Sequence, residues 1–192
     1  LHAMEVAYLE NDRNELEITR PVSLKEIVVG TELDTSGNKI DLTALESLIV
    51  GFQLNKDSLR KCGFCEFDLK RTLFSNDFVQ KHKFERIRDI RLKIICSQNV
   101  QLNAELIMKS NTLVVDDKIS IVNRIGIQNM ATSTAISDCG KFQFNFKSDK
   151  FSPFEGAGLE SAWKLYVTAP QDFDPVTISD VIVYVSYTAR NG

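Results

Sequence analysis

Residues 181–187 read Val-Ile-Val-Tyr-Val-Ser-Tyr, and this run decides the class of fold. β-Branched and aromatic residues favour strands, and apolar residues at consecutive positions indicate a strand that is buried on both faces. We therefore expect a central strand here. Upstream, residues 163–167 read Trp-Lys-Leu-Tyr-Val. Their alternation predicts a second strand, with Trp163 in phase with Leu165 and Val167 and facing a core.

The same period of two recurs along the rest of the chain. Apolar and polar residues alternate in three further segments: residues 90–96, 100–108 and 142–146. Leu16 and Ile18 start an early strand, and Pro21 places it at a sheet edge because proline cannot donate a ladder hydrogen bond. Turn signals separate the strands at four places: residues 36–38, 116–117, 138–140 and 172–175. Short strands between regular turns predict an antiparallel β-sandwich.

Helix is expected only in short pieces. Residues 5–11 fit the end of a helix, and residues 76–83 fit another turn or two. Asp41 is a candidate N-cap for a short helix. The apolar positions of that helix share one side: Leu42, Leu45, Leu48 and Ile49. The sequence thus predicts a mainly β fold, an antiparallel β-sandwich with one or two short helices and an N-terminal helix remnant.

Composition narrows the class of protein further. The 192 residues suit one domain with an ordinary core, at 43% hydrophobic and 26% charged residues. The net charge of −3 is spread along the chain, which argues against nucleic-acid binding. No apolar run approaches the ~18–20 residues of a membrane helix, and no signal peptide opens the chain. Since it begins at Leu1-His2-Ala3-Met4 without an initiating residue, we expect a piece of a longer polypeptide.

The four cysteines give no strong sign of chemistry. Cys62 and Cys65 form a C-x-x-C pair, whereas Cys96 and Cys139 stand far from it and only two histidines exist. A zinc ribbon needs a second close pair, and a thioredoxin-like site needs a strand-to-helix context that residues 66–69 do not supply. We expect ordinary thiols in or near the core, and disulfides remain an alternative. No metal or cofactor is expected.

The sequence gives equally weak evidence for catalytic residues. His82 lies in the basic run Gln80-Lys81-His82-Lys83, and His2 lies at the chain start, so neither has a partner that would make it a base. The Asp116-Asp117 pair is more typical of a turn than of an acid–base pair. Gly156-Ala157-Gly158 lacks the spacing and the lysine of a phosphate loop, and its glycines suit a tight turn. We expect that the protein is not an enzyme and has no catalytic residues.

Several ordered motifs resemble one family. They are residues 153–158 (Pro-Phe-Glu-Gly-Ala-Gly), the Trp163 strand, residues 177–182 (Thr-Ile-Ser-Asp-Val-Ile) and residues 187–190 (Tyr-Thr-Ala-Arg). Near the start, residues 7–10 and 16–19 fit as well, as does the segment 65–69 with Leu73-Phe74 and Arg86-Ile87 after it. Together they resemble the C-terminal B-subunit-binding domain of the A subunit of bacterial toxin-complex (Tc) toxins. Departures at Lys70-Arg71 and at residues 80–83 fall in expected loops and bear on partner specificity.

The resemblance implies a function. In these secreted toxins the A subunit is a homopentameric translocation channel, and its terminal domain binds the β-propeller of the B subunit in the B–C cocoon. Docking opens the propeller gate to the toxic cargo. The resemblance therefore implies a virulence-related docking module whose partners are the B subunit and other A-subunit copies, with no nucleic acid and no membrane contact. It also implies that residues 1–13 end a helical connection and residues 14–192 form the binding domain.

Contact residues are chosen on general grounds: interfaces favour aromatic and arginine anchors, and a basic strand face suits an acidic partner. The candidates are loop aromatics and a basic strand face: Phe74, Phe78, Phe151, Phe173, Arg91 and Lys93. For the phenylalanines the alternative is a loop residue folded back onto the core, and for Arg91 and Lys93 it is a solvated face.

A second functional class stays open beside the docking module. A β-sandwich that displays Trp163, Tyr166, Tyr184 and Tyr187 on its surface would suit a carbohydrate-binding module. The phase of Trp163 argues against it. An enzyme would need a pocket with converging titratable groups, which the sequence does not indicate.

Overall fold

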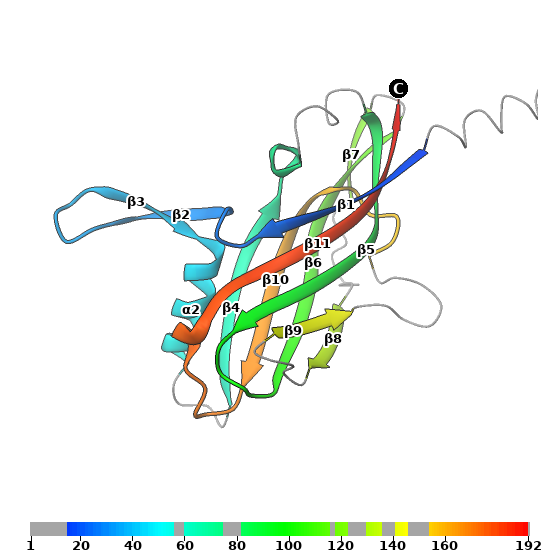
Figure 1. Ribbon diagram of the computed structural model, residues 1–192. Coiled ribbons are helices and arrows are strands. Elements are labelled where there is room, and N and C mark those ends of the chain that lie inside the picture. The colour runs from blue at the N-terminus through cyan, green and yellow to red at the C-terminus, as the bar shows by residue number, and fades with distance from the viewer. Residues whose placement is uncertain are drawn as a thin grey trace, which may run out of the picture.

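The computed structural model describes residues 15–55, 60–74, 82–115, 118–122, 130–135, 141–145 and 154–191. Two antiparallel sheets pack around one core (Figure 1), which confirms the predicted mainly β sandwich. The first sheet has the strand order β1 (Glu15–Ser23), β11 (Ile178–Asn191), β5 (His82–Cys96) and β9 (Lys141–Asn145). The second has the order β4 (Lys61–Leu69), β10 (Glu160–Ala169), β6 (Leu102–Val115) and β7 (Lys118–Val122), and β8 (Met130–Ala135) also pairs with β6.

Smaller elements lie outside these sheets. A separate two-stranded sheet is formed by β2 (Val28–Leu33) and β3 (Lys39–Thr43). One α-helix, α2 (Ala44–Leu54), follows it directly. Two short 3₁₀ turns are η1 (Arg71–Leu73) and η2 (Pro175–Thr177). In the described ranges no helix has the length and apolar character needed to span a bilayer.

Strand β11 occupies the centre of the first sheet, as its apolar run predicts. It pairs with β1 on one side and β5 on the other, and Val183 lies opposite both Val22 and Leu92. Alternate side chains from Val181 to Val185 are almost fully buried between the sheets. Strand β1, which carries Pro21, lies at the sheet edge as expected.

Strand β10, which carries Trp163, lies between β4 and β6 in the second sheet, and the glycine turn before it bonds to Ile87 of β5 in the first sheet. Trp163 is 1% exposed, and its ring meets the Phe154 ring edge-on at 4.8 Å between centroids. The indole N–H donates to Ser161 Oγ at 2.7 Å, which satisfies its buried donor. Gly156 has φ +82°, a conformation that glycine adopts without steric cost. The turn thus lays Phe154 over Trp163.

Helix α2 covers part of the outer edge of the second sheet. A Cβ at Gly51 would stand 2.8 Å from both the backbone N and the backbone O of Phe64 in β4, so helix and strand touch through their backbones. The Asn55 amide donates to the Cys62 carbonyl at 3.3 Å on the same edge. Covering an edge strand in this way prevents unwanted pairing.

Two helix predictions need correction. The N-cap of α2 is Thr43 and not Asp41, because Thr43 and Glu46 form a capping box in which each side chain accepts from the other's backbone N–H. Asp41 lies in β3 instead. His82 begins β5, so the predicted helical turn does not extend to it. Residues 1–13 and 75–81 lie outside the described residues.

Candidate protein interface

Exposed apolar side chains gather on one side of the domain. Every large hydrophobic residue found exposed in the described part of the chain lies on β2, β3, α2, β4 or η2: Val28, Val29, Leu33, Ile40, Val50, Leu54, Phe64 and Val176. Figure 1 shows β2, β3 and α2 on the side of the sandwich where β4 lies. We call this face the arm side. Grouped exposed apolar residues mark interaction sites more often than scattered ones do.

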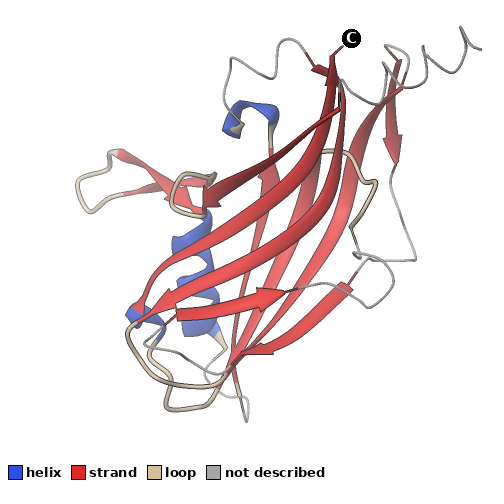
Figure 2. Ribbon diagram, turned by 45° about the vertical axis from the view of Figure 1, so that its right-hand side comes forward, coloured by secondary structure: helices blue, strands red, loops and turns tan. Residues whose placement is uncertain are grey.

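The hairpin of β2 and β3, residues 28–43, is the most exposed part of this side, and we call it the arm. It stands clear of the sandwich in both views (Figures 1 and 2). Leu33 is 69% exposed and Ile40 is 51% exposed. Leu33 pairs with Lys39 and Ile40 pairs with Glu32, so the two side chains point to opposite faces of the arm. An isolated two-stranded hairpin is at best marginally stable in water. Exposed apolar residues on such a hairpin suit burial against another molecule.

The tip of the arm is held by a network around Asp34. Its carboxylate accepts from the backbone N–H of Ser36 at 2.8 Å and of Asn38 at 2.7 Å, and from the Asn38 side chain at 3.0 Å. Gly37 takes φ +82° and closes the turn. The hydrogen bond from the Asn38 side chain is the main cause that lowers the pKa of Asp34 below its ordinary 3.8. The tip is therefore pre-organised.

The base of the arm is tied to the core. The Ala44 N–H at the start of α2 donates to the Ile27 carbonyl at 2.8 Å, and the Leu24 N–H donates to the Val181 carbonyl at 2.9 Å. Leu24, Ile27 and Ala44 are all buried. The fold thus presents the arm from a fixed base.

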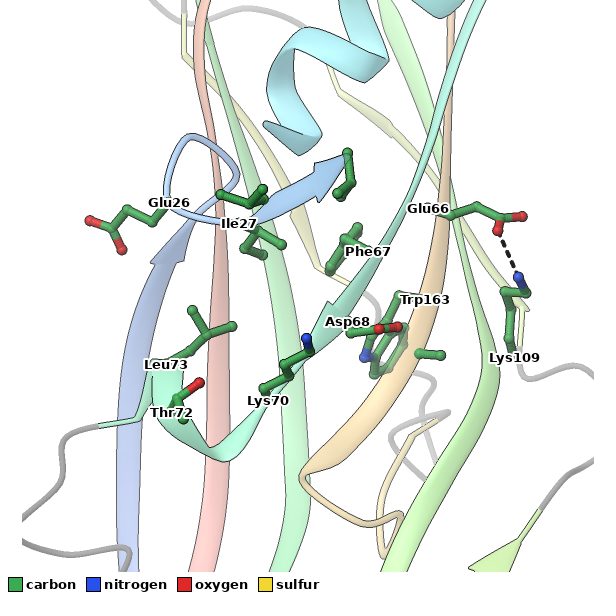
Figure 3. Close-up of a pocket in the computed structure, with 13 residues that line it drawn as sticks. Glu26, Ile27, Glu66, Phe67, Asp68, Lys70, Thr72, Leu73, Lys109 and Trp163 are labelled. Atoms are coloured by element: carbon green, nitrogen blue, oxygen red, sulfur yellow. Dashed lines mark hydrogen bonds and ion pairs between the residues drawn. The ribbon is translucent and has the colours of Figure 1, made fainter. Parts of the chain in front are cut away.

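A cleft of about 500 Å³ opens below the arm, and we call it the edge cleft (Figure 3). One wall is the arm base at residues 26–29, the other is the edge of β4 at residues 66–68, and η1 closes the end. Phe67 and Trp163 contribute to its lining although both are buried. The cleft combines apolar walls with charged groups at its rim.

Ion pairs hold the outer face of the second sheet beside the cleft. Lys109 Nζ lies 2.7 Å from Glu66 Oε2, and Lys164 Nζ lies 3.7 Å from Glu66 Oε1. The hydrogen bond from Lys109 is the main cause that lowers the pKa of Glu66. Lys164 Nζ also stands over the rings of Tyr166 at 4.9 Å and Phe64 at 5.7 Å. The ammonium group thus lies within the range of a cation–π interaction with both rings.

Of the six residues predicted from the sequence, the four that the structure describes do not gather into one surface. Phe74 and Phe173 are fully buried, with ring centroids 5.4 Å from Tyr187 and 5.5 Å from Phe52, so both have folded back onto the core. Phe78 and Phe151 lie outside the described residues.

The two predicted basic residues lie on β5, in the other sheet. Arg91 is half-buried, with its guanidinium 5.6 Å from the centroid of the Tyr184 ring and its Nε 3.9 Å from Asp89. Lys93 is half-buried on the same strand. Neither residue adjoins the arm.

The glycan platform is incomplete, because Trp163 and Tyr187 are buried and cannot stack on a sugar.

The cysteine pair lies along β4. Cys62 and Cys65 are three residues apart on one strand, so they face opposite sides of the sheet, and both are free thiols. Cys96, also a free thiol, lies 3.1 Å from the Thr177 hydroxyl. Cys139 is outside the described residues. Among the described side chains, no three His, Cys, Asp or Glu residues lie close enough to hold a metal ion.

Sequence reasoning missed the arm although it identified the turn at residues 36–38. The missed signal is Leu33 and Ile40, which flank that turn in the otherwise polar stretch of residues 31–41. Apolar residues on a hairpin that is polar on both faces indicate a partner.

A family model matches residues 31–189, and the family is described as the Tc toxin complex TcA C-terminal TcB-binding domain. The toxin subunit YenA2 of Yersinia entomophaga is 26% identical over 212 aligned residues. The match spans 100% of this chain and 14% of the length of that relative.

Solved structures are less similar. Turnip yellow mosaic virus gives a TM-score of 0.38 at 8% identity, over 92% of this chain and 81% of the other. Desmodium yellow mottle tymovirus gives a TM-score of 0.36 at 6% identity, over 92% of this chain and 88% of the other. Scores this low carry no argument about function.

Proposed function

Because the chain belongs to the family of TcA C-terminal TcB-binding domains, we propose that it binds the B subunit of a Tc toxin during assembly. The family match over residues 31–189 carries this proposal, since it spans nearly the whole sandwich and most of the arm. A role in Tc toxin assembly follows from membership of the family.

We propose further that the partner surface is the β-propeller of the B–C cocoon, and that binding opens the propeller gate so that cargo enters the channel of the A subunit. The chemistry needed from this domain is binding alone. Binding can shift the equilibrium between the closed and the open gate only by the difference between the free energies with which the domain binds the two states. Copies of the domain around one axis, as in a homopentamer, would add their contacts if the geometry allows simultaneous engagement.

The arm is the surface that we assign to this contact. Its apolar residues are exposed in the described structure, and its tip and base are held by hydrogen bonds that need no partner. A rigid contact element loses little conformational entropy on binding, so more of the burial energy appears as affinity. This supports the arm as the contact surface in preference to the loop phenylalanines predicted from the sequence, of which Phe74 and Phe173 are buried.

A competition experiment tests the proposal. The full-length A subunit is mixed with its B–C cocoon in the presence of increasing amounts of this chain, and holotoxin is counted by negative-stain microscopy. We expect the chain to reduce holotoxin formation in proportion to its occupancy of the cocoon. Undiminished assembly at saturating chain, together with circular dichroism of a folded β protein, contradicts the proposal.

A further inference from the structure

The backbone of β4 has two edges, and residue parity decides which groups face outward. Phe64 N and O both face α2, since the Cβ position of Gly51 lies 2.8 Å from each, and Cys62 O accepts from Asn55 on the same edge. In an antiparallel strand the N–H and C=O of one residue point to the same side, and the side alternates along the strand. The pairing of β4 with β10 runs from Lys61 to Leu69 without a register shift. Glu66 and Asp68 therefore also turn their backbone groups outward.

Helix α2 does not cover these two residues. In the described structure β4 pairs with β10 alone, and the backbone hydrogen bonds found outside the sheets include none to Glu66 or Asp68. The edge at this point lines the edge cleft, opposite the exposed Val28 and Val29 of the arm base. Unpaired strand edges are templates for another strand, and proteins usually cover them. Helix α2 covers the edge of β4 only as far as Phe64.

We propose that the edge cleft accepts a short extended segment of the B subunit, which adds as a strand to β4 at Glu66 and Asp68. This rests on the proposed function. Extended backbone is the occupant that offers donors and acceptors at the spacing of the two outward residues, about 6.6 Å apart along the strand. The cleft is closed by the arm base and by η1, so only a few residues of the segment fit.

The walls and the rim define the side chains of that segment. Ile27 and Leu73 line the cleft (Figure 3). Together they suit contact with one apolar side chain of the bound segment. Glu66 is paired with Lys109 and Lys164, whereas Glu26 and Asp68 form no ion pair in the described structure. Lys70 also lines the cleft. Two carboxylates against one ammonium favour a basic side chain on the bound segment, next to the apolar one.

A proline substitution separates backbone from side-chain recognition. Asp68→Pro removes the outward N–H, which β10 does not use, and edge strands tolerate proline at such positions. Asp68→Ala removes the carboxylate and keeps the N–H, so it is the matched control. Binding of each variant to the B–C cocoon is measured by interferometry, after circular dichroism and a thermal melt. We expect Asp68→Pro to bind at least about fivefold more weakly than Asp68→Ala, because a buried acceptor on the partner is left unpaired.

Hydrogen exchange on the wild-type chain decides the matter if the proline variant does not fold. The amides of Glu66 and Asp68 should exchange rapidly in the free chain and at least about tenfold more slowly when the cocoon is bound, while the Phe67 amide, already bonded to β10, changes little. Equal binding of the two variants, or unchanged exchange at both amides in a saturated complex, overturns this proposal alone. Failure of the wild-type chain to bind overturns the proposed function as well.

Discussion

The arm gives the sharpest quantitative prediction. Leu33→Ser and Ile40→Ser together remove apolar side chains that are 69% and 51% exposed, a little more than one fully exposed side chain in total. The two side chains lie on opposite faces of the arm, so a partner that encloses the arm buries both, which is worth about 2–3 kcal/mol. The double variant should therefore bind the B–C cocoon about 30- to 150-fold more weakly than the wild-type chain.

The same change should leave the fold almost untouched. Substitutions of exposed residues away from caps and buried networks usually change the free energy of unfolding by about 0.5 kcal/mol or less. Val176→Ser is the matched control, because Val176 is 67% exposed but lies in η2 and not on the arm. It should bind as the wild-type chain does.

Interferometry with the cocoon immobilised measures the three dissociation constants, and urea denaturation measures the three stabilities. The arm is not the contact surface if the arm variant binds within twofold of the wild-type chain, or if Val176→Ser loses as much affinity as the arm variant. A loss of affinity that accompanies a loss of stability would also contradict it, because the arm would then be part of the folded core.

Three further predictions concern stability, pH and thiol reactivity. Phe154→Ala removes a fully buried ring from its contact with Trp163 and should lower the free energy of unfolding by about 3–5 kcal/mol, seen as a melting temperature about 6–20 °C lower. The folded pKa of Asp34 lies below its ordinary 3.8, so its hydrogen bonds stabilise the arm tip above pH 3.8 and are lost as the pH falls through the lower folded value. Amide exchange at Asn38, corrected for intrinsic rates, should accelerate only in that acid range, and the Asp34→Ala chain should show no such step. Burial raises the pKa of the Cys65 thiol to about 12, so iodoacetamide at about pH 8 should label it only as fast as the chain unfolds; rapid labelling of the folded chain contradicts this.

Much of the fold was predictable because side-chain periodicity directly reflects burial. The continuous apolar run of residues 181–187 identified the central strand β11, and the phase of Trp163 identified the core face of β10. The helix start was misplaced by two residues because Asp41 and Thr43 are both good caps, and the capping box with Glu46 favours Thr43.

The interface was harder to predict because exposure is a property of tertiary structure. Phe173 lies within the turn signal at residues 172–175, where exposure is expected, yet it packs on Phe52 from α2, an element far away in the sequence. The exposure of Leu33 depends on the arm projecting away from the sandwich, which local propensity does not encode. The outward backbone of Asp68 follows only from pairing register and from where α2 ends.

The most direct test of the central claim is the dissociation constant between this chain and its cognate B–C cocoon, with the chain presented on the sensor at low and at high density. We expect saturable binding at both densities, and tighter apparent binding at high density because neighbouring copies engage one cocoon together. No binding at either density by a chain that circular dichroism shows to be folded, with no binding by the full-length A subunit under the same conditions, would contradict the claim that this domain docks the B subunit.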